Sequence, residues 1–381
     1  MIYLDNSATT PLCAGAKNAI EYAMEHFGNP SSLHFAGEEG AKIKKDARDT
    51  LLKALDARKE QYELVFTSGG TEANNLAIFG VANAKNYKNP KILISDSEHP
   101  CILEPCKRLA EKGFRVVQIP TRGGRLDEEV FYKELDENTV LVSFMSVNNE
   151  TGAVYRIKPL FDAAHQKNPK VLCHTDGVQA FLKIPFTPKT TGADLLTVSS
   201  HKVHGPKGCG GLLISKEVLK RKALLPLICG GGQEDGLRSG TENTLGIAGF
   251  AGAVAEKAAA LKENAEKTRT LRAFLLSRLP EEIHPNLPES PAPHILSLTL
   301  PNIKSQTALN FLSSKGICVS SGSACANNGG HQSYVLTAFG LTEKEADSTL
   351  RISLSEDNTE EELLVLLSAL EEATRTLVRF R

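Results

Sequence analysis

The chain has 381 residues, 41% of them hydrophobic and 23% charged, and its 44 basic and 45 acidic residues leave a net charge of −1. These values are typical of a globular protein of about two domains, which can bury a large core without disulfide or metal support. The even charge offers no basic stripe for nucleic acid, and no apolar run reaches the roughly 18 residues of a membrane span. We therefore expect neither a nucleic-acid partner nor a membrane partner.

The amino-terminal stretch MIYLDNSATTP carries Asp5 and lacks the basic and apolar regions of a signal peptide. We therefore expect a cytoplasmic protein whose eight cysteines are thiols. None of them forms Cys-x-x-Cys, and none stands at zinc-finger spacing from a histidine, so no metal site is predicted. We interpret seven as small buried hydrophobes and set Cys325 apart.

The first two thirds of the chain predict a parallel sheet. A helix at 36–55 is followed by strands that alternate with helices such as 101–113. The predicted strands are 63–68, 91–96, 115–120, 139–147, 171–176, 194–200 and 210–215. They are rich in Val, Ile and Leu without strict alternation, which is typical of strands covered on both faces. The pattern predicts a mainly parallel α/β sheet flanked by helices.

The last third predicts a smaller α/β unit. An Ala- and Lys-rich helix is expected over 243–279, and a proline-rich break follows at 285–293. The elements expected after it are a strand at 294–300, a helix at 305–315, a strand at 317–321, a helix at 333–340, a strand at 348–354 and a helix at 359–380. We predict a large domain of residues 14–258 and a small domain of residues 1–13 and 259–381.

Small and polar residues follow the predicted strands, where open α/β sheets bind ligands. The stretch SGGTEANN after the first strand places two glycines and Thr71 at a helix start. Backbone N–H groups there would form an anion cradle suited to a phosphate. The alternative is that the stretch is a plain glycine-rich turn.

Polar or ionisable side chains follow four more strands. His99 comes after the second strand, Asn149 after the fourth, Asp176 with Gln179 after the fifth, and Ser199, His201 and Lys202 after the sixth. Singly these could be a surface histidine, a helix cap and a solvated lysine. Together they match what pyridoxal 5′-phosphate (PLP) needs: an amine for the Schiff base, a carboxylate for the pyridine nitrogen and a ring to stack.

Cys325 lies in SSGSACANNGG, a stretch of Ser, Gly and Asn that can neither bury a side chain nor form a regular element. A thiol is the strongest nucleophile among the side chains, and we expect it here on an exposed loop at about 321–333.

The ordered motifs YLDNSATTP, FTSGGTEANN, SEH, VNNETG, TDGVQ, SSHKVHGPKG, RSGTEN, SSGSAC and LRISL resemble those of the cysteine desulfurases from end to end. These are PLP-dependent enzymes of fold type I in the class V aminotransferase superfamily. SSGSAC resembles the branch that contains the nitrogen-fixation and housekeeping iron–sulfur enzymes, rather than the sulfur-mobilisation branch.

The resemblance implies a role for each matching residue. Lys202 resembles the Schiff-base lysine, and His99 resembles the ring-stacking histidine that also moves protons. Asp176 and Gln179 match the partners of the pyridine nitrogen and the ring oxygen. The implied phosphate ligands are Gly70, Thr71, Ser199 and His201, joined by the partner subunit's Thr241, so a homodimer is implied.

Arg351 resembles the clamp on the substrate carboxylate, helped by Asn149 and Asn29. Cys325 resembles the nucleophile that takes sulfur from L-cysteine as a persulfide and leaves L-alanine. A loop carrying that sulfur could visit both the cofactor and an acceptor protein, such as an iron–sulfur scaffold or a tRNA-thiolation enzyme. For Arg238 two roles stay open: it could orient its own loop or contact the partner subunit. We expect His204 and His331 to be non-catalytic.

Two other functions stay open at this point. The same scaffold could serve a selenocysteine lyase or another PLP-dependent β-eliminase, which would not need Cys325. A sulfur-relay or assembly protein without turnover is the non-enzymatic alternative. The joint presence of Lys202, Asp176, His99, Arg351 and Cys325 argues against the latter.

Overall fold

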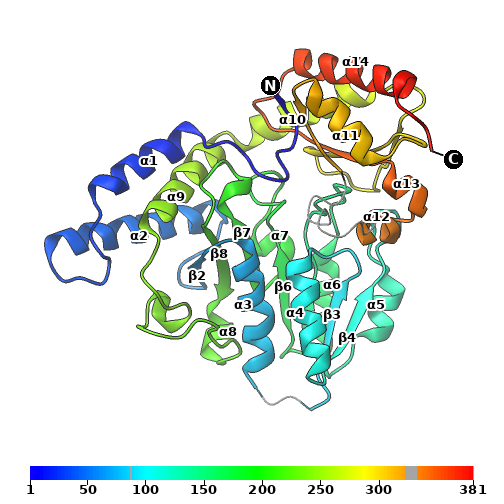
Figure 1. Cartoon of the computed structure of the whole chain (residues 1–381). Helices are drawn as coiled ribbons and strands as arrows, with labels where there is room; N and C mark the ends of the chain where they lie inside the picture. Colours follow the sequence, from blue (N-terminus) through cyan, green and yellow to red (C-terminus); the bar gives the residue numbers. More distant parts are fainter. Residues whose placement is uncertain (86–87, 322–332, 381) are drawn as a thin grey trace.

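The computed structural model describes residues 1–85, 88–321 and 333–380 (Figure 1). Its largest sheet has the strand order β2-β8-β7-β6-β5-β3-β4. The strands are β2 (Tyr62–Thr67), β3 (Lys91–Ser95), β4 (Arg115–Ile119), β5 (Thr139–Ser143), β6 (Leu172–Asp176), β7 (Leu195–Ser199) and β8 (Gly210–Ser215). β8 pairs antiparallel with both β2 and β7, and the other strand pairs in this sheet are parallel. The predicted mainly parallel sheet is therefore confirmed.

Helices cover both faces of this sheet (Figure 1). Alternate strand residues enter two different cores: Leu64 and Phe66 lie in one, and Val65 lies in the other. This explains the unbroken apolar runs in the sequence. The helices of the first core include α2 (Phe35–Ala54), α5 (Glu128–Glu134), α6 (Ile157–Lys167) and α9 (Thr244–Ala259). Those of the second core include α3 (Gly70–Asn83), α4 (Pro100–Glu111) and α8 (Lys216–Lys220).

A smaller layer lies above the carboxyl ends of the parallel strands (Figure 1). It contains an antiparallel sheet in the order β12-β13-β10-β9 and a two-stranded pair β1-β11. The strands are β1 (Ile2–Tyr3), β9 (His284–Pro285), β10 (Ile295–Thr299), β11 (Ile317–Cys318), β12 (Ser320–Ser321) and β13 (Thr349–Ser353). The helices around them are α10 (Leu261–Leu276), α11 (Ser305–Ser314) and α14 (Glu360–Thr376). Because β1 pairs with β11, the amino terminus joins this layer.

Shorter elements complete the fold. They are α1 (Ala14–Glu25), α7 (Pro188–Thr191), α12 (Tyr334–Phe339), α13 (Glu343–Asp347), η1 (Arg122–Gly124), η2 (Ser200–Lys202) and η3 (Glu234–Gly236). Across the described ranges, no single helix has the length and apolar composition to cross a bilayer. The α9–α10 pair meets that test by length and composition only, with a bend of 74°.

The single helix expected over 243–279 is wrong, because the chain breaks at Ala260 into α9 and α10. The two halves serve different cores: Phe250 and Val254 pack with the large sheet, whereas Leu271 and Leu275 pack in the small layer. The strand expected at 317–321 also divides, since β11 pairs with β1 and β12 pairs with β13. The last helix ends at Thr376 rather than near residue 380.

Candidate active site

A cavity of about 310 Å³ opens between the carboxyl ends of the parallel strands and the small layer. Ten of the predicted residues line it: Gly70, Thr71, His99, Asn149, Asp176, Gln179, Ser199, His201, Lys202 and Arg351. Asn29 and Thr241 are exposed and do not belong to its lining. Cys325 and His331 lie outside the described residues.

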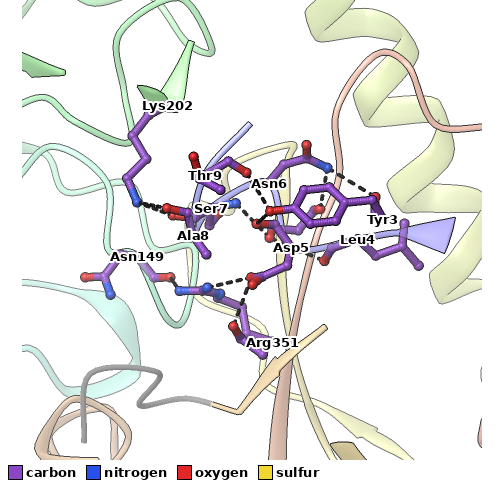
Figure 2. Close-up of polar contacts among 12 residues, drawn as sticks. Tyr3, Leu4, Asp5, Asn6, Ser7, Ala8, Thr9, Asn149, Lys202 and Arg351 are labelled. Atoms are coloured by element: carbon purple, nitrogen blue, oxygen red, sulfur yellow. Dashed lines mark hydrogen bonds and ion pairs between the residues drawn. The ribbon is translucent and has the colours of Figure 1, made fainter. Parts of the chain in front are cut away.

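Lys202 reaches the cavity from η2, directly after β7. Its Nζ donates hydrogen bonds to the carbonyls of Ser7 at 2.6 Å and Ala8 at 2.7 Å (Figure 2). The amino-terminal segment is held there by Thr10, whose backbone N–H donates to the His201 carbonyl. The lysine is thus aimed by backbone acceptors, and a segment far away in sequence forms one wall of the cavity.

Asp176 ends β6 and faces the same cavity. Its Oδ2 accepts a hydrogen bond of 2.6 Å from Asn74 Nδ2, and its Oδ1 accepts one of 2.9 Å from the Val178 backbone N–H. Asn74 Nδ2 also lies 3.0 Å from Cys101 Sγ, which in turn lies 2.9 Å from His99 Nδ1. One polar chain therefore connects the buried carboxylate to the imidazole.

His99 caps the start of α4, where its Nδ1 accepts from the Cys101 backbone N–H at 3.2 Å. Burial lowers the pKa of His99; Asp176 opposes this shift and Lys202 adds to it. The ring is therefore neutral near pH 7. With Nδ1 acting as an acceptor, its proton lies on Nε2.

The start of α3 has the uncapped backbone that an anion cradle needs. Gly69 occupies the N-cap with φ 153° and no side-chain cap, so the first N–H groups of the helix are left without a capping side chain. A Cβ on Gly70 would stand 2.7 Å from the Val178 methyl, so only glycine fits there without a shift. The positive end of the helix dipole of α3, which has 14 residues and begins at Gly70, therefore lies in the same cavity lining as Ser199 and His201.

His201 is neutral in this cradle. Burial lowers its pKa to about 4, and the neighbouring charges of Lys202 and Lys207 add to the shift. Its Nδ1 lies 3.1 Å from Thr9 Oγ1, which fixes the ring against the amino-terminal segment. Arg238 Nε donates to Glu72 Oε1 in the first turn of α3 at 2.9 Å, and Arg238 does not line the cavity.

Arg351 extends from β13 and is only 5% exposed. Its Nη1 donates to the Asn149 carbonyl at 2.9 Å, and its Nη2 donates to Asp5 Oδ1 at 2.8 Å (Figure 2). Nε has no hydrogen-bond partner among the described residues. A buried guanidinium with spare donors at the edge of the cavity is suited to grip a carboxylate.

The two flanks of the segment that contains Cys325 lie close to this cavity. On one side, Ser320 pairs with Arg351 across the sheet and its Oγ donates to Asp5 Oδ1 at 2.9 Å. On the other side, Tyr334 Oη donates to the Glu98 carbonyl at 2.6 Å, next to His99. Ser333 Oγ donates to Glu150 Oε2, also at 2.6 Å. The described residues on either side of 322–332 are therefore held beside the site.

Sequence reasoning missed several residues that shape the site: Asp5, Ser7, Ala8, Asn74, Cys101, Met145, Val147 and Val178. Asn74 and Cys101 lie on helices, where only the helix orientation decides which side chain faces the cavity. YLDNSATTP and SEHPC contain Asp5 and Cys101, but nothing in those motifs indicates the ion pair of Asp5 or the sulfur contact of Cys101.

The aminotransferase class-V family model matches residues 2–366, so the chain belongs to that family. Its relatives within the family include cysteine desulfurases. It is 36% identical over 389 aligned residues to cysteine desulfurase IscS of Dictyoglomus turgidum, covering 100% of this chain and 97% of that protein.

Solved structures agree with this. A NifS-like protein superimposes with a TM-score of 0.91 at 37% identity, covering 99% of this chain and 100% of that one. SspA in complex with cysteine superimposes with a TM-score of 0.82 at 31% identity, covering 94% and 100%.

Enzymes of this family depend on PLP, and the residues present fit that group. The cavity supplies an amine, a carboxylate beside it, a neutral imidazole and an uncapped helix start suited to a phosphate. The buried Gln179 Oε1 also lacks a hydrogen-bond partner among the described residues, while its Nε2 donates to the Ser7 carbonyl. A polar ligand in the cavity would satisfy such a group.

Proposed function

We propose that this protein is a PLP-dependent cysteine desulfurase that converts L-cysteine to L-alanine and receives the sulfur on Cys325 as a persulfide. The observation that carries the proposal is one cavity lined by Lys202, Asp176, His99 and Arg351, with both flanks of the Cys325 segment beside it. The end-to-end similarity to cysteine desulfurases supports the same conclusion.

The cofactor would be held by groups of three kinds. Lys202 is the residue that binds it covalently, and Asp176 with Gln179 meets the ring. Gly70, Thr71, Ser199 and His201 hold its phosphate at the start of α3. When bound, PLP supplies the electron sink that allows bonds at the amino-acid Cα and Cβ to break.

The substrate would be oriented by its carboxylate. Arg351 grips it with the help of Asn149, and Asp5 holds the guanidinium in place. We propose that Asn29 also contacts the substrate once the homodimer has formed. His99, with its neutral ring, moves protons near Cα.

The sulfur transfer balances without an added reductant or oxidant. The Cys325 thiolate attacks the substrate sulfur, so a sulfur–sulfur bond forms and the Cβ–sulfur bond breaks. The carbon keeps the electron pair and takes up the proton that the thiol lost, which completes alanine. L-cysteine and the enzyme thiol thus become L-alanine and the enzyme persulfide.

We propose a homodimer, and two sets of exposed residues support it. Thr241 does not line the cavity of its own subunit, so its proposed phosphate contact would be made in the cavity of the partner subunit. Large apolar side chains around α1 and the start of α2 are exposed, with Phe27 at 82%, Leu33 at 96% and Phe35 at 82%. A second copy would cover this patch.

The delivery partner is proposed at the level of chemistry. A persulfide on Cys325 would be taken by an acceptor thiol on an iron–sulfur scaffold or a tRNA-thiolation enzyme. We propose the cytoplasm as the location, since the seven cysteines that the structure describes are free. The proposed domain division stays at 14–258 against 1–13 with 259–381, and the β1–β11 pairing supports assigning the first residues to the small domain.

The test is alanine formation from L-cysteine with a thiol reductant, comparing the wild type with Cys325→Ser after bound PLP is confirmed by absorption. We expect turnover in the wild type and loss in the variant that still binds PLP. Equal alanine formation would favour a lyase, for which selenocysteine is the diagnostic substrate. A protein that cannot bind PLP would instead favour the sulfur-relay alternative.

A further inference from the structure

A second, smaller cavity of about 40 Å³ shares Lys202 with the active-site cavity in its lining. Its walls come from four parts of the chain: the amino-terminal segment with Asn6, the large sheet region with Lys183, the α9–α10 pair with Lys257, and the small layer with His294. Roughly 10–15 Å³ of such volume suffices for one water, so an occupant larger than one water fits.

Lys183 is the first of two groups in this cavity that lack a hydrogen-bond partner among the described residues. Its Nζ is buried and has no hydrogen-bond partner within the described ranges, although part of the residue is accessible. Leu182 before it has φ 55°, and His204, which also lines the cavity, has φ 63°, both in the left-handed region. Backbone strain at two non-glycine residues costs free energy, so the surrounding structure enforces this lining.

His294 supplies a second unsatisfied group. It is 3% exposed, and neither ring nitrogen makes a hydrogen bond of acceptable geometry to a described residue, although the Gln179 backbone lies close. Burial holds the pKa of His294 well below its usual range, with Lys183 contributing, so the ring is neutral and has one N–H to donate.

The charges around the cavity favour an anion. Lys183, Lys202 and Lys257 line it, and Glu356 is the only carboxylate among the described residues of the lining. Lys257 Nζ already lies 2.8 Å from that carboxylate. His204, Glu356 and Asp357 could offer three ligand atoms to a metal ion, but the Lys257 ammonium beside Glu356 disfavours a cation. The positive groups thus outnumber the negative one.

We propose that this cavity is a binding site for a small monovalent anion of halide size, held by the Lys183 ammonium and the His294 N–H. The anion would join Lys183 of the large sheet region to His294 of the small layer, in a cavity that Lys202 also lines. Water could satisfy hydrogen bonds there but could not compensate the buried charge.

Protonation of Lys183 couples to this site. Burial lowers the pKa of Lys183 to about 7; Lys202 and Arg351 add to the shift, and Glu356 opposes it. Lys202, Lys257, His204, His294 and Glu356 are the other titratable groups that face the cavity. Because the ammonium is cationic only below its pKa, halide should bind more tightly at pH 6.5 than at pH 8.5.

The first experiment measures thermal unfolding of the PLP-loaded protein in sodium bromide or chloride against sodium gluconate at equal ionic strength. We expect halide to raise the midpoint by about 1–3 °C at pH 6.5 and by less at pH 8.5. Lys183→Met should abolish the halide-specific shift, and Lys189→Met, at an exposed lysine six residues further along the chain, should keep it.

The second experiment does not depend on a variant that folds. Crystals of the wild type grown in bromide should show an anomalous peak beside Lys183 Nζ. Water alone at that position overturns the proposal, and so does a halide shift of equal size in the wild type and Lys183→Met. Neither result would bear on desulfurase activity, which is measured separately.

Discussion

Nδ1 of His99 lies 2.9 Å from Sγ of Cys101, inside the catalytic cavity. The same sulfur lies 3.0 Å from Asn74 Nδ2, which can donate only. The arrangement fits a protonated thiol that accepts from Asn74 and donates to the imidazole. Burial raises the pKa of Cys101 well above its usual range, and Asp176 contributes to the shift. A thiol that stays protonated is a poor nucleophile, even when it lines the site.

We therefore predict that Cys101 does not carry the transferred sulfur. Cys101→Ser should keep the rate of alanine formation within about threefold, because a hydroxyl retains both a donor and an acceptor. Cys325→Ser should lose at least about 100-fold, because it removes the nucleophile. Mass spectrometry of the protein after exposure to L-cysteine checks where sulfur is added. Persulfide found on Cys101 in the Cys325→Ser variant would contradict this prediction.

Asn74 gives a second prediction, since its amide donates to Asp176 Oδ2 at 2.6 Å. Asn74→Ala removes a hydrogen bond to a buried carboxylate, and such bonds contribute about 1.5–3 kcal/mol. We expect kcat to fall about 10- to 100-fold while the KM for L-cysteine changes little. Asn75→Ala is the matched control, because Asn75 donates to the Thr71 carbonyl and does not line the cavity. Equal effects of the two substitutions would show that Asn74 has no special role.

Much of the fold could be predicted because its signals are local. The strand that ends at Asp176 and the strand that precedes Lys202 are continuous apolar runs, and their carboxyl ends meet at one edge of the sheet. The break at Ala260 could not be predicted, because no glycine or proline marks it. It arises where one helix leaves the core that holds Phe250 and another enters the core that holds Leu271.

The site was predictable where a strand end fixes the direction of a side chain, as for Lys202. It was not predictable where a long-range contact decides the position. Ser7 and Ala8 accept from Lys202 in a segment that long-range contacts hold in place, such as the pairing of Ile2 with Ile317, more than 300 residues away, and the bond from Thr10 to the His201 carbonyl. No local pattern contains that pairing, so the wall formed by the amino-terminal segment is visible only in the structure.

Glu98 provides a prediction on stability and pH. It is fully buried, and burial raises its pKa to about 8. Its Oε1 accepts from Ser95 and Met145, while Oε2 has no partner among the described residues. The folded state therefore holds a proton that the unfolded carboxylate releases near pH 4–5. Because the folded-state pKa is the higher one, the stabilising contribution is largest at low pH and is lost as pH rises towards 8.

Glu98→Gln should remove this loss, because the amide imitates the protonated acid at every pH. We expect the wild-type unfolding midpoint to fall by about 2–4 °C more than that of the variant between pH 6 and pH 9. Glu104→Gln, at an exposed position of α4, the helix that begins two residues after Glu98, should follow the wild type. Parallel pH profiles for all three proteins would mean that Glu98 is ionised in the folded state.

Arg351 gives the last prediction, which concerns the substrate carboxylate. Its guanidinium donates to the Asn149 carbonyl and to the Asp5 carboxylate, and Arg351 also lines the cavity. Binding a substrate carboxylate in addition requires several donors in a fixed geometry. Arg351→Lys replaces them with one compact ammonium, so the KM for L-cysteine should rise about 10- to 100-fold, more than kcat falls. Arg375→Lys, at an exposed position of α14, should leave both constants unchanged. Steady-state kinetics with L-cysteine and with cysteamine, which lacks the carboxylate, complete the test. If the clamp is at Arg351, the variant loses efficiency only with L-cysteine, and an equal loss with both compounds would place the carboxylate elsewhere.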